Sequence, residues 1–199
     1  MNLNKLTILA SLPLLAVAAN AGTFGQQYIG VQGAYVDGDG FDGNGAAIAY
    51  NLPVVQQERF GIDATVGVQY ANIDYGRYWG DDDLVSLNGG VVAYFPLNNV
   101  VTPFVGVQIG NDWQNAGDES DFVFGGTIGL ELSANDQLSF IVNTGAARNE
   151  EANATAYSVG VSANYWLTEV VGLNVGFDHT NIQDADDYDT YTAGVLFRF

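Results

Sequence analysis

The chain of 199 residues carries 23 acidic and five basic residues and no cysteine, and its formal net charge is −18 at pH 7. This balance excludes nucleic acid as a partner, because phosphate binding requires a basic surface, and the lack of cysteine excludes disulfides and thiol chemistry. Beyond the N-terminal region, no apolar run approaches the roughly 20 residues of a membrane-spanning helix.

The N-terminus has the pattern of a secretory signal peptide, assigned to residues 1–21. Residues 1–5 include a lysine, residues 6–18 form an apolar run, and residues 19–21 fit an A-x-A cleavage site. We expect cleavage before Gly22, which leaves residues 22–199 as one domain. A membrane-anchoring helix is disfavoured, because the run is too short and no stop-transfer pattern follows it.

The rest of the chain is a series of segments in which apolar residues alternate with small or polar ones, which is the period of a β-strand. Residues 60–71 show it most clearly, with aromatic residues near both ends and aliphatic residues between them, as in a strand that crosses a hydrocarbon layer. In chain order, the expected strands are residues 28–36, 46–52, 60–71, 85–95, 101–109, 122–132, 138–148, 157–167, 173–179 and 191–199.

Longer acidic connections alternate with short turns between these strands. The longer ones are residues 37–44, 76–83, 111–121, 149–153 and 183–189. An even number of strands with long loops on one side and short turns on the other is what a transmembrane barrel requires, with both termini in the periplasm. We therefore predict an all-β fold, a closed antiparallel up-and-down barrel of ten strands, or of eight if residues 28–52 pair poorly. A soluble β-sandwich also alternates, but it would carry lysines on its edges.

The last strand links the chain to a known family. Tyr191, Val195, Phe197 and Phe199 share one face of this strand. The alternation, with a terminal Phe and a Tyr eight residues before it, resembles the C-terminal assembly signal of bacterial outer-membrane β-barrel proteins. The resemblance implies a Gram-negative outer membrane, contact with outer-membrane lipids and lipopolysaccharide, and insertion through the barrel assembly machinery. We expect a monomer.

Most of the acidic residues fall at the outer end of this topology. The simplest interpretation is that they keep polar loops hydrated. A sharper hypothesis is that they bind divalent cations, which take several carboxylate oxygens. Asp37, Asp39 and Asp42 lie in a stretch that partly resembles a calcium loop, although Phe41 occupies a ligand position of the EF-hand pattern. We expect no other cofactor.

Inward-facing residues predict a crowded periplasmic base. Asp63, Glu131 and Arg198 point inward there, and Arg198 beside either carboxylate would form a buried ionic cluster, since a charge in low dielectric needs a partner. Phe104 and Trp166 also point inward near this end, whereas inward positions toward the outside are mostly Gly, Ser, Asn, Thr and Ala. We therefore expect a cavity that is wider outside than at its base.

Two enzyme families share this barrel architecture. Asp178 and His179 superficially resemble the Asp/His pair of omptin-like proteases, but adjacent strand residues point to opposite faces. Lipid A deacylase-like barrels use an outward His with a Ser two positions later, where this chain has Asn181. Acyl transfer requires a nucleophile next to a base, and this chain lacks that pair. We therefore expect that the protein is not an enzyme.

These observations favour a small outer-membrane barrel with a structural or surface-interaction role and acidic extracellular loops. The alternative is a narrow, passive, porin-like channel for small solutes. A lipid A-modifying enzyme or an omptin-like protease is a remote third possibility.

Overall fold

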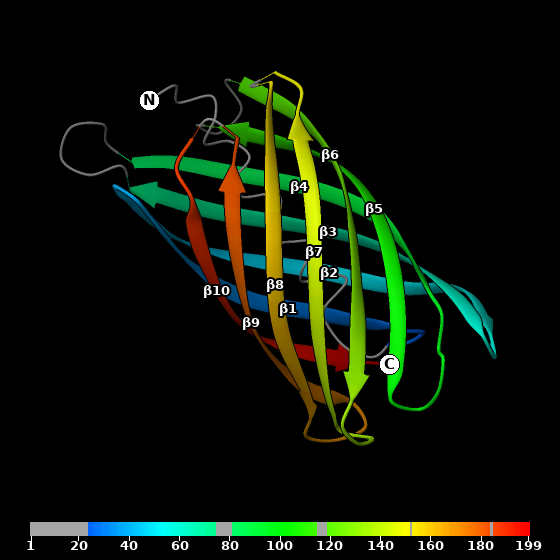
Figure 1. Cartoon of the computed structure of the whole chain (residues 1–199). Helices are drawn as coiled ribbons and strands as arrows, with labels where there is room; N and C mark the ends of the chain where they lie inside the picture. Colours follow the sequence, from blue (N-terminus) through cyan, green and yellow to red (C-terminus); the bar gives the residue numbers. More distant parts are fainter. Residues whose placement is uncertain (1–23, 75–80, 115–118, 152, 184) are drawn as a thin grey trace.

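A computed structural model describes residues 24–74, 81–114, 119–151, 153–183 and 185–199. These residues form ten strands that close into one antiparallel barrel (Figure 1). The strands are β1 Tyr28–Gly38, β2 Phe41–Gln57, β3 Phe60–Asp74, β4 Asp81–Tyr94, β5 Val101–Gln114, β6 Glu119–Ser133, β7 Leu138–Asn149, β8 Ala154–Trp166, β9 Val171–Ile182 and β10 Tyr188–Arg198.

Each strand pairs with its neighbours in sequence, and β1 also pairs with β10 to close the barrel. The predicted ten-stranded up-and-down fold is confirmed. The eight-stranded alternative is wrong, because β1 pairs with β2 along its whole length. The predicted signal peptide, residues 1–21, lies outside the described residues, so its cleavage before Gly22 remains a prediction. None of the described residues belongs to a helix long and apolar enough to cross a membrane.

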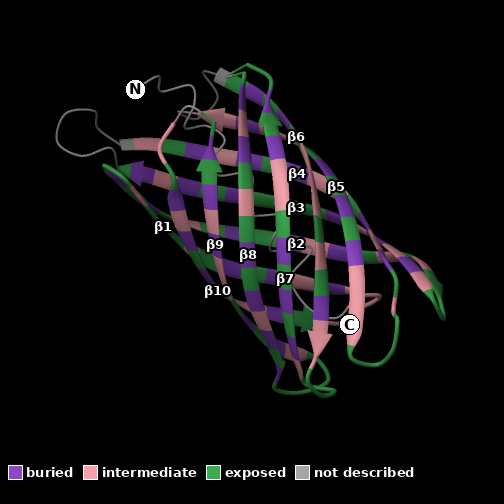
Figure 2. Ribbon diagram, viewed as in Figure 1, coloured by how far each residue is buried: buried purple, intermediate pink, exposed green. Residues whose placement is uncertain are grey.

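Side chains alternate between the barrel interior and its outer surface along every strand (Figure 2). In β3, Asp63, Thr65 and Gln69 are buried inside, while Val66 and Val68 are about half exposed outside. The same exposed apolar series continues around the barrel, in residues such as Ile48, Leu87, Val107, Ile128, Val142, Val161 and Val175. A closed barrel with an apolar outer band has no protein partner for that band, so the band suits lipid.

Aromatic side chains border this band at both ends. Toward the outer end lie Tyr35, Tyr70, Tyr157 and Tyr191, and toward the periplasmic end lie Tyr50, Phe60, Phe95, Phe140, Tyr165, Phe197 and Phe199. Several are paired, as in Phe60 with Phe95 (ring centroids 5.3 Å apart) and Tyr50 with Phe199 (6.2 Å). This is the arrangement of interfacial aromatic girdles.

The strands run further outward than the sequence suggested. The predicted loop at residues 37–44 is wrong, because β1 and β2 are joined by Asp39 and Gly40 alone. Gly40 has φ 90°, a conformation that glycine adopts at little cost and that tight hairpin turns require. Parts of the other acidic connections, including residues 81–83 and 188–189, also belong to strands. Many acidic residues therefore lie on strand ends and not in loops.

The periplasmic half of β2 also differs from expectation. The strand was expected to end before Pro53, yet it continues to Gln57. The register with β3 shifts between Pro53 and Val55. Because proline cannot donate to the ladder, it interrupts the pairing with an irregularity without ending the strand.

Three of the four turns at the periplasmic end, all but the one between β2 and β3, are held by the same type of side-chain hydrogen bond. Asn98, Asn135 and Thr168 each accept hydrogen bonds through a side-chain oxygen from the backbone amides two and three residues later, at 2.8–3.2 Å. Such side-chain turns hold tight connections between antiparallel strands. They fix the end of the barrel that is expected to face the periplasm.

Candidate functional site: barrel interior and outer rim

The predicted ionic cluster lies at the periplasmic base of the interior. Asp63 and Glu131 are buried, and Oδ2 of Asp63 accepts hydrogen bonds from the Gly25 amide at 2.9 Å and from Asn51 Nδ2 at 3.0 Å. The guanidinium of Arg198 lies 3.8 Å from the centre of a Trp166 ring, a cation–π contact. This contact was not foreseen, and an ion pair of Arg198 with Asp63 or Glu131 stays a prediction.

Large rings at the base lie across glycines of the neighbouring strand. The direct cross-strand partners are Tyr94 with Gly61, Phe104 with Gly129, and Trp166 with Gly172. A Cβ built on these glycines would lie 2.0, 2.6 and 2.9 Å from the respective ring. The missing side chains thus let the rings lie flat along the barrel wall, and for Trp166 this extends the ring toward Arg198 on β10. These pairs of an aromatic residue and a glycine are present in the sequence, but they can be recognised only once the register between the strands is known.

The middle of the interior is polar. The amide pair Asn164 and Asn174 is joined by a hydrogen bond of 2.7 Å. Other buried side chains have a polar atom without a hydrogen-bond partner among the described residues, namely Gln32, Ser86, Asn88, Gln108, Asn143, Ser162 and Thr190. Because buried polar atoms are almost always satisfied by protein or water, this belt suits water or a polar solute.

The outer end of the interior combines an apolar cluster with buried polar side chains such as Asp112, Asp121 and Asn149. The prediction that its inward residues are mostly small or polar is therefore wrong, and the relative width of the two ends stays a prediction. Buried side chains that pack together there are Val36, Phe41, Ala71, Ile73, Val123, Ala147, Ala154, Ala156, Ile182 and Tyr188. The expected strands stopped short of most of these positions, so their inward direction was not recognised. We call this group the outer apolar cluster.

A row of carboxylates circles part of the outer rim on the outward face. The register places Asp74 opposite Asp42, Asp42 opposite Asp37, and Asp37 opposite Asp189, and directly opposed residues share a face. Asp189 in turn faces His179. Like charges in such a row repel one another unless water and counter-ions screen them. The row therefore marks a level outside the hydrocarbon layer.

His179 ends this row and is half exposed. Its Nδ1 lies 2.8 Å from Oδ1 of Asp189, while Asp178 is buried in the interior, as the alternation predicted. The nearest hydroxyl in sequence, Thr180, is also buried inside, and the side chain of Asn181 donates to Asp187. His179 and Asp189 are thus arranged like a general base and the carboxylate that orients it. Neither Thr180 nor Asn181 supplies the hydroxyl that would serve as nucleophile.

The calcium hypothesis remains a prediction. Asp37 and Asp42 are opposed across β1 and β2, and Asp39 lies in the turn that joins them. No group of three or more His, Asp or Glu side chains placed to hold a metal ion occurs among the described residues. Calorimetric titration of the refolded barrel with calcium tests the hypothesis, and the absence of saturable heat would reject it.

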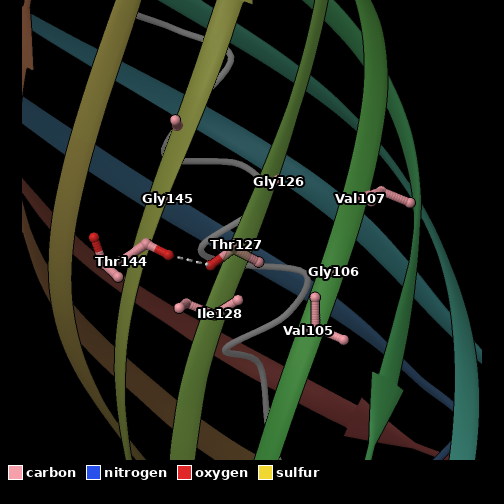
Figure 3. Close-up of a pocket in the computed structure, with 9 residues that line it drawn as sticks. Val105, Gly106, Val107, Gly126, Thr127, Ile128, Thr144 and Gly145 are labelled. Atoms are coloured by element: carbon pink, nitrogen blue, oxygen red, sulfur yellow. Dashed lines mark hydrogen bonds between the residues drawn. The ribbon is translucent and has the colours of Figure 1, made fainter.

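The outward surface is hollowed where small residues meet. One shallow hollow of about 380 Å³ lies around Gly126, between Val105, Val107 and Ile128 (Figure 3). Thr144 also lines it, and its hydroxyl donates to a backbone carbonyl of β8 at 2.8 Å. Since most lining side chains belong to the outward series, the hollow opens toward the lipid and not into the interior.

The closed barrel, its apolar band and its girdles define a transmembrane barrel of the outer-membrane type. The chain belongs to the outer membrane protein beta-barrel domain family, whose model matches residues 7–199. This membership indicates an outer-membrane location, as expected from the C-terminal strand. Tyr191, Val195, Phe197 and Phe199 all lie on the outward face of the chain's end. Their role as an assembly signal stays a prediction.

Several solved structures are similar. They include the translocator domain of the autotransporter NalP from Neisseria meningitidis, with 10% identity, a TM-score of 0.56 and 94% of each chain covered. An outer membrane channel from Pseudomonas putida F1 has 10% identity and a TM-score of 0.55, with 89% of this chain and 97% of that chain covered. The NanC porin has 13% identity and a TM-score of 0.50, with 86% and 100% covered. These identities show a shared fold alone. No curated protein matches the sequence.

Proposed function

We propose that the protein is a non-enzymatic outer-membrane barrel that presents an acidic surface outside the cell and does not form an open pore. The observation that carries this proposal is the packing of the interior at its periplasmic base. Val92, Tyr94, Phe104 and Ile141 pack together there, and the outer apolar cluster narrows the other end. Small barrels have interiors that side chains can nearly fill.

The length of the strands supports a surface role. β2 has 17 residues and β3 has 15. In a strand tilted by about 45°, each residue rises roughly 2.4 Å along the membrane normal. The two strands therefore span roughly 35–40 Å, against an apolar band of about 25 Å. The excess places the carboxylate row above the lipid, where it faces a cationic partner or divalent ions shared with lipopolysaccharide.

A binding experiment tests this surface role. Proteoliposomes with the refolded barrel are titrated with fluorescent oligolysine at low and physiological salt. We expect salt-dependent binding that weakens when Asp37, Asp42 and Asp74 are replaced by Asn, because the row then loses adjacent charges. Replacing the acidic residues of the opposite end, Glu58, Asp136 and Glu169, is the matched control. Equal losses from the two sets would contradict an outer binding surface.

The polar belt in the middle favours the second candidate, a narrow passive channel. Recording from planar bilayers separates the two candidates. The proposal expects no stable conductance from the wild-type barrel, since ions must pass the packed periplasmic base. A large, steady conductance would support the channel and reject the closed barrel.

We also propose that His179 and Asp189 do not catalyse acyl transfer, because Thr180 points into the barrel and Asn181 replaces the expected serine. Incubation with labelled lipid A should release no acyl chain. A monomer in contact with outer-membrane lipids and lipopolysaccharide, inserted by the assembly machinery through its last strand, completes the proposal. Light scattering of the refolded barrel in detergent tests its monomeric state, and a dimer would contradict it.

A further inference from the structure

The segment that precedes β1 enters the base of the barrel. The ring of Phe24 stacks on Tyr94, with ring centroids 5.1 Å apart and planes 13° apart, and lies 5.0 Å from the ring of Phe104. Phe24 also packs against the group that contains Val92 and Ile141. A ring from outside the sheet thus completes the apolar packing of the periplasmic end.

The backbone of the same segment is held by inward side chains. The Gly25 amide donates to Asp63 Oδ2 at 2.9 Å. Asn51 Nδ2 donates to the Gln26 carbonyl at 2.7 Å and to the same carboxylate oxygen at 3.0 Å, and the Gln56 side chain donates to the Gly25 carbonyl. Gly25 also requires its own residue type, since its φ is 79°. Side chains of β2 and β3 therefore hold Gly25 and Gln26, while rings of β4 and β5 contact Phe24.

From these contacts we propose that residues 24–26 are a tethered plug that closes the periplasmic end of the interior. Residues 24–26 precede β1 and are held to the wall by the packing of the Phe24 ring and by hydrogen bonds to inward side chains. They can therefore leave without breaking the barrel ladder. Their departure would uncover Asp63 and Glu131, two inward carboxylates at the base. The opened base would then admit ions and favour cations.

Four barrels recorded in planar bilayers test the plug. They are the chain of residues 22–199, its Phe24→Ala variant, a chain that starts at Gln27, and a Gln27→Ala control. The control changes the same segment outside the plug, because Gln27 Nε2 donates to the hydroxyl of the outward-facing Tyr50 at 2.8 Å. Circular dichroism and heat-dependent gel migration establish that each barrel is folded.

We expect the chain that starts at Gln27 to conduct roughly tenfold more than residues 22–199, since a constriction governs the passage of ions. Phe24→Ala should give more frequent openings and Gln27→Ala no change. The reversal potential of the opened barrel in a salt gradient should show a preference for cations, which Asp63→Asn should reduce.

The proposal rests on the closed barrel proposed above, but the two can fail separately. Steady conductance of residues 22–199 equal to that of the shortened chain would reject both. A closed wild type with a folded, equally closed shortened chain would reject the plug and leave the closed barrel standing. If the shortened chain does not refold, Phe24→Ala decides, and openings no more frequent than in the control would reject the plug.

Discussion

A positive charge at the centre of the outer band should destabilise the barrel more than one at its rim. Val107 is the seventh of the 14 residues of β5 and is 63% exposed on the outer surface. At roughly 2.4 Å of rise along the membrane normal per residue, it lies about 14 Å below Trp113, six residues further along the strand. Half of an apolar band of about 25 Å is less than this distance, so Val107 lies near the midplane.

Val107→Arg should therefore lower the free energy of unfolding by about 2–4 kcal/mol, the cost of arginine at the midplane of a transmembrane barrel. Ser120→Arg is the matched control, because Ser120 is exposed and lies opposite Trp113 across β5 and β6. At that level the expected cost is about 0–1 kcal/mol.

Reversible urea unfolding in phospholipid vesicles, followed by tryptophan fluorescence, measures both variants. The reasoning predicts a difference of about 2 kcal/mol or more between the two positions. Equal costs, or a cost below about 1 kcal/mol for Val107→Arg, would refute the placement of β5 in the hydrocarbon layer.

Three further predictions concern packing and assembly. Gly129→Ala should lower the unfolding free energy by about 1–3 kcal/mol, because the new methyl group would lie 2.4 Å from a carbonyl oxygen of β7, whereas Gly89→Ala has its nearest atom 3.7 Å away; equal urea midpoints would contradict this. A double-mutant cycle of Trp166→Leu with Arg198→Gln should give a coupling of about 0.5–2 kcal/mol, and a coupling near zero would argue against the cation–π contact. Phe199→Ala should reduce folded barrel in cellular outer membranes while changing the stability of the refolded chain by less than about 1 kcal/mol, since 65% of Phe199 is exposed; normal cellular levels would contradict its role in assembly.

The sequence was enough to predict the class of fold and the direction of most side chains. The two-residue alternation is set by strand geometry, and a barrel in lipid must keep one face of every strand apolar. For this reason the alternation alone puts Val66 and Val161 on the outward face and Asp63 on the inward face, as in the structure. The short turns were also predictable, because Asn135 and Thr168 carry side chains that hold tight connections.

The features that the sequence did not predict depend on contacts between distant segments. Asp and Gly disfavour strands in isolation, so residues 37–44 were taken for a loop, yet they pair with a strand on each side. The position of the Trp166 ring over Gly172 can be predicted only from the exact register, which alternation alone does not fix. The packing of Phe24 in the base depends on rings of β4 and β5, and no local sequence pattern predicts it.

The central claim is that the outer face of each strand meets lipid and the inner face does not. The chain has no cysteine, so single cysteines carrying nitroxide labels can be placed along β8 at each residue from 157 to 165. In vesicles, labels at 157, 159, 161, 163 and 165 should collide with lipid-dissolved oxygen, and those at 158, 160, 162 and 164 should not, which gives a period of two. Accessibility without this alternation, or outward labels that react with a water-soluble relaxation agent, would contradict the barrel's placement in the membrane.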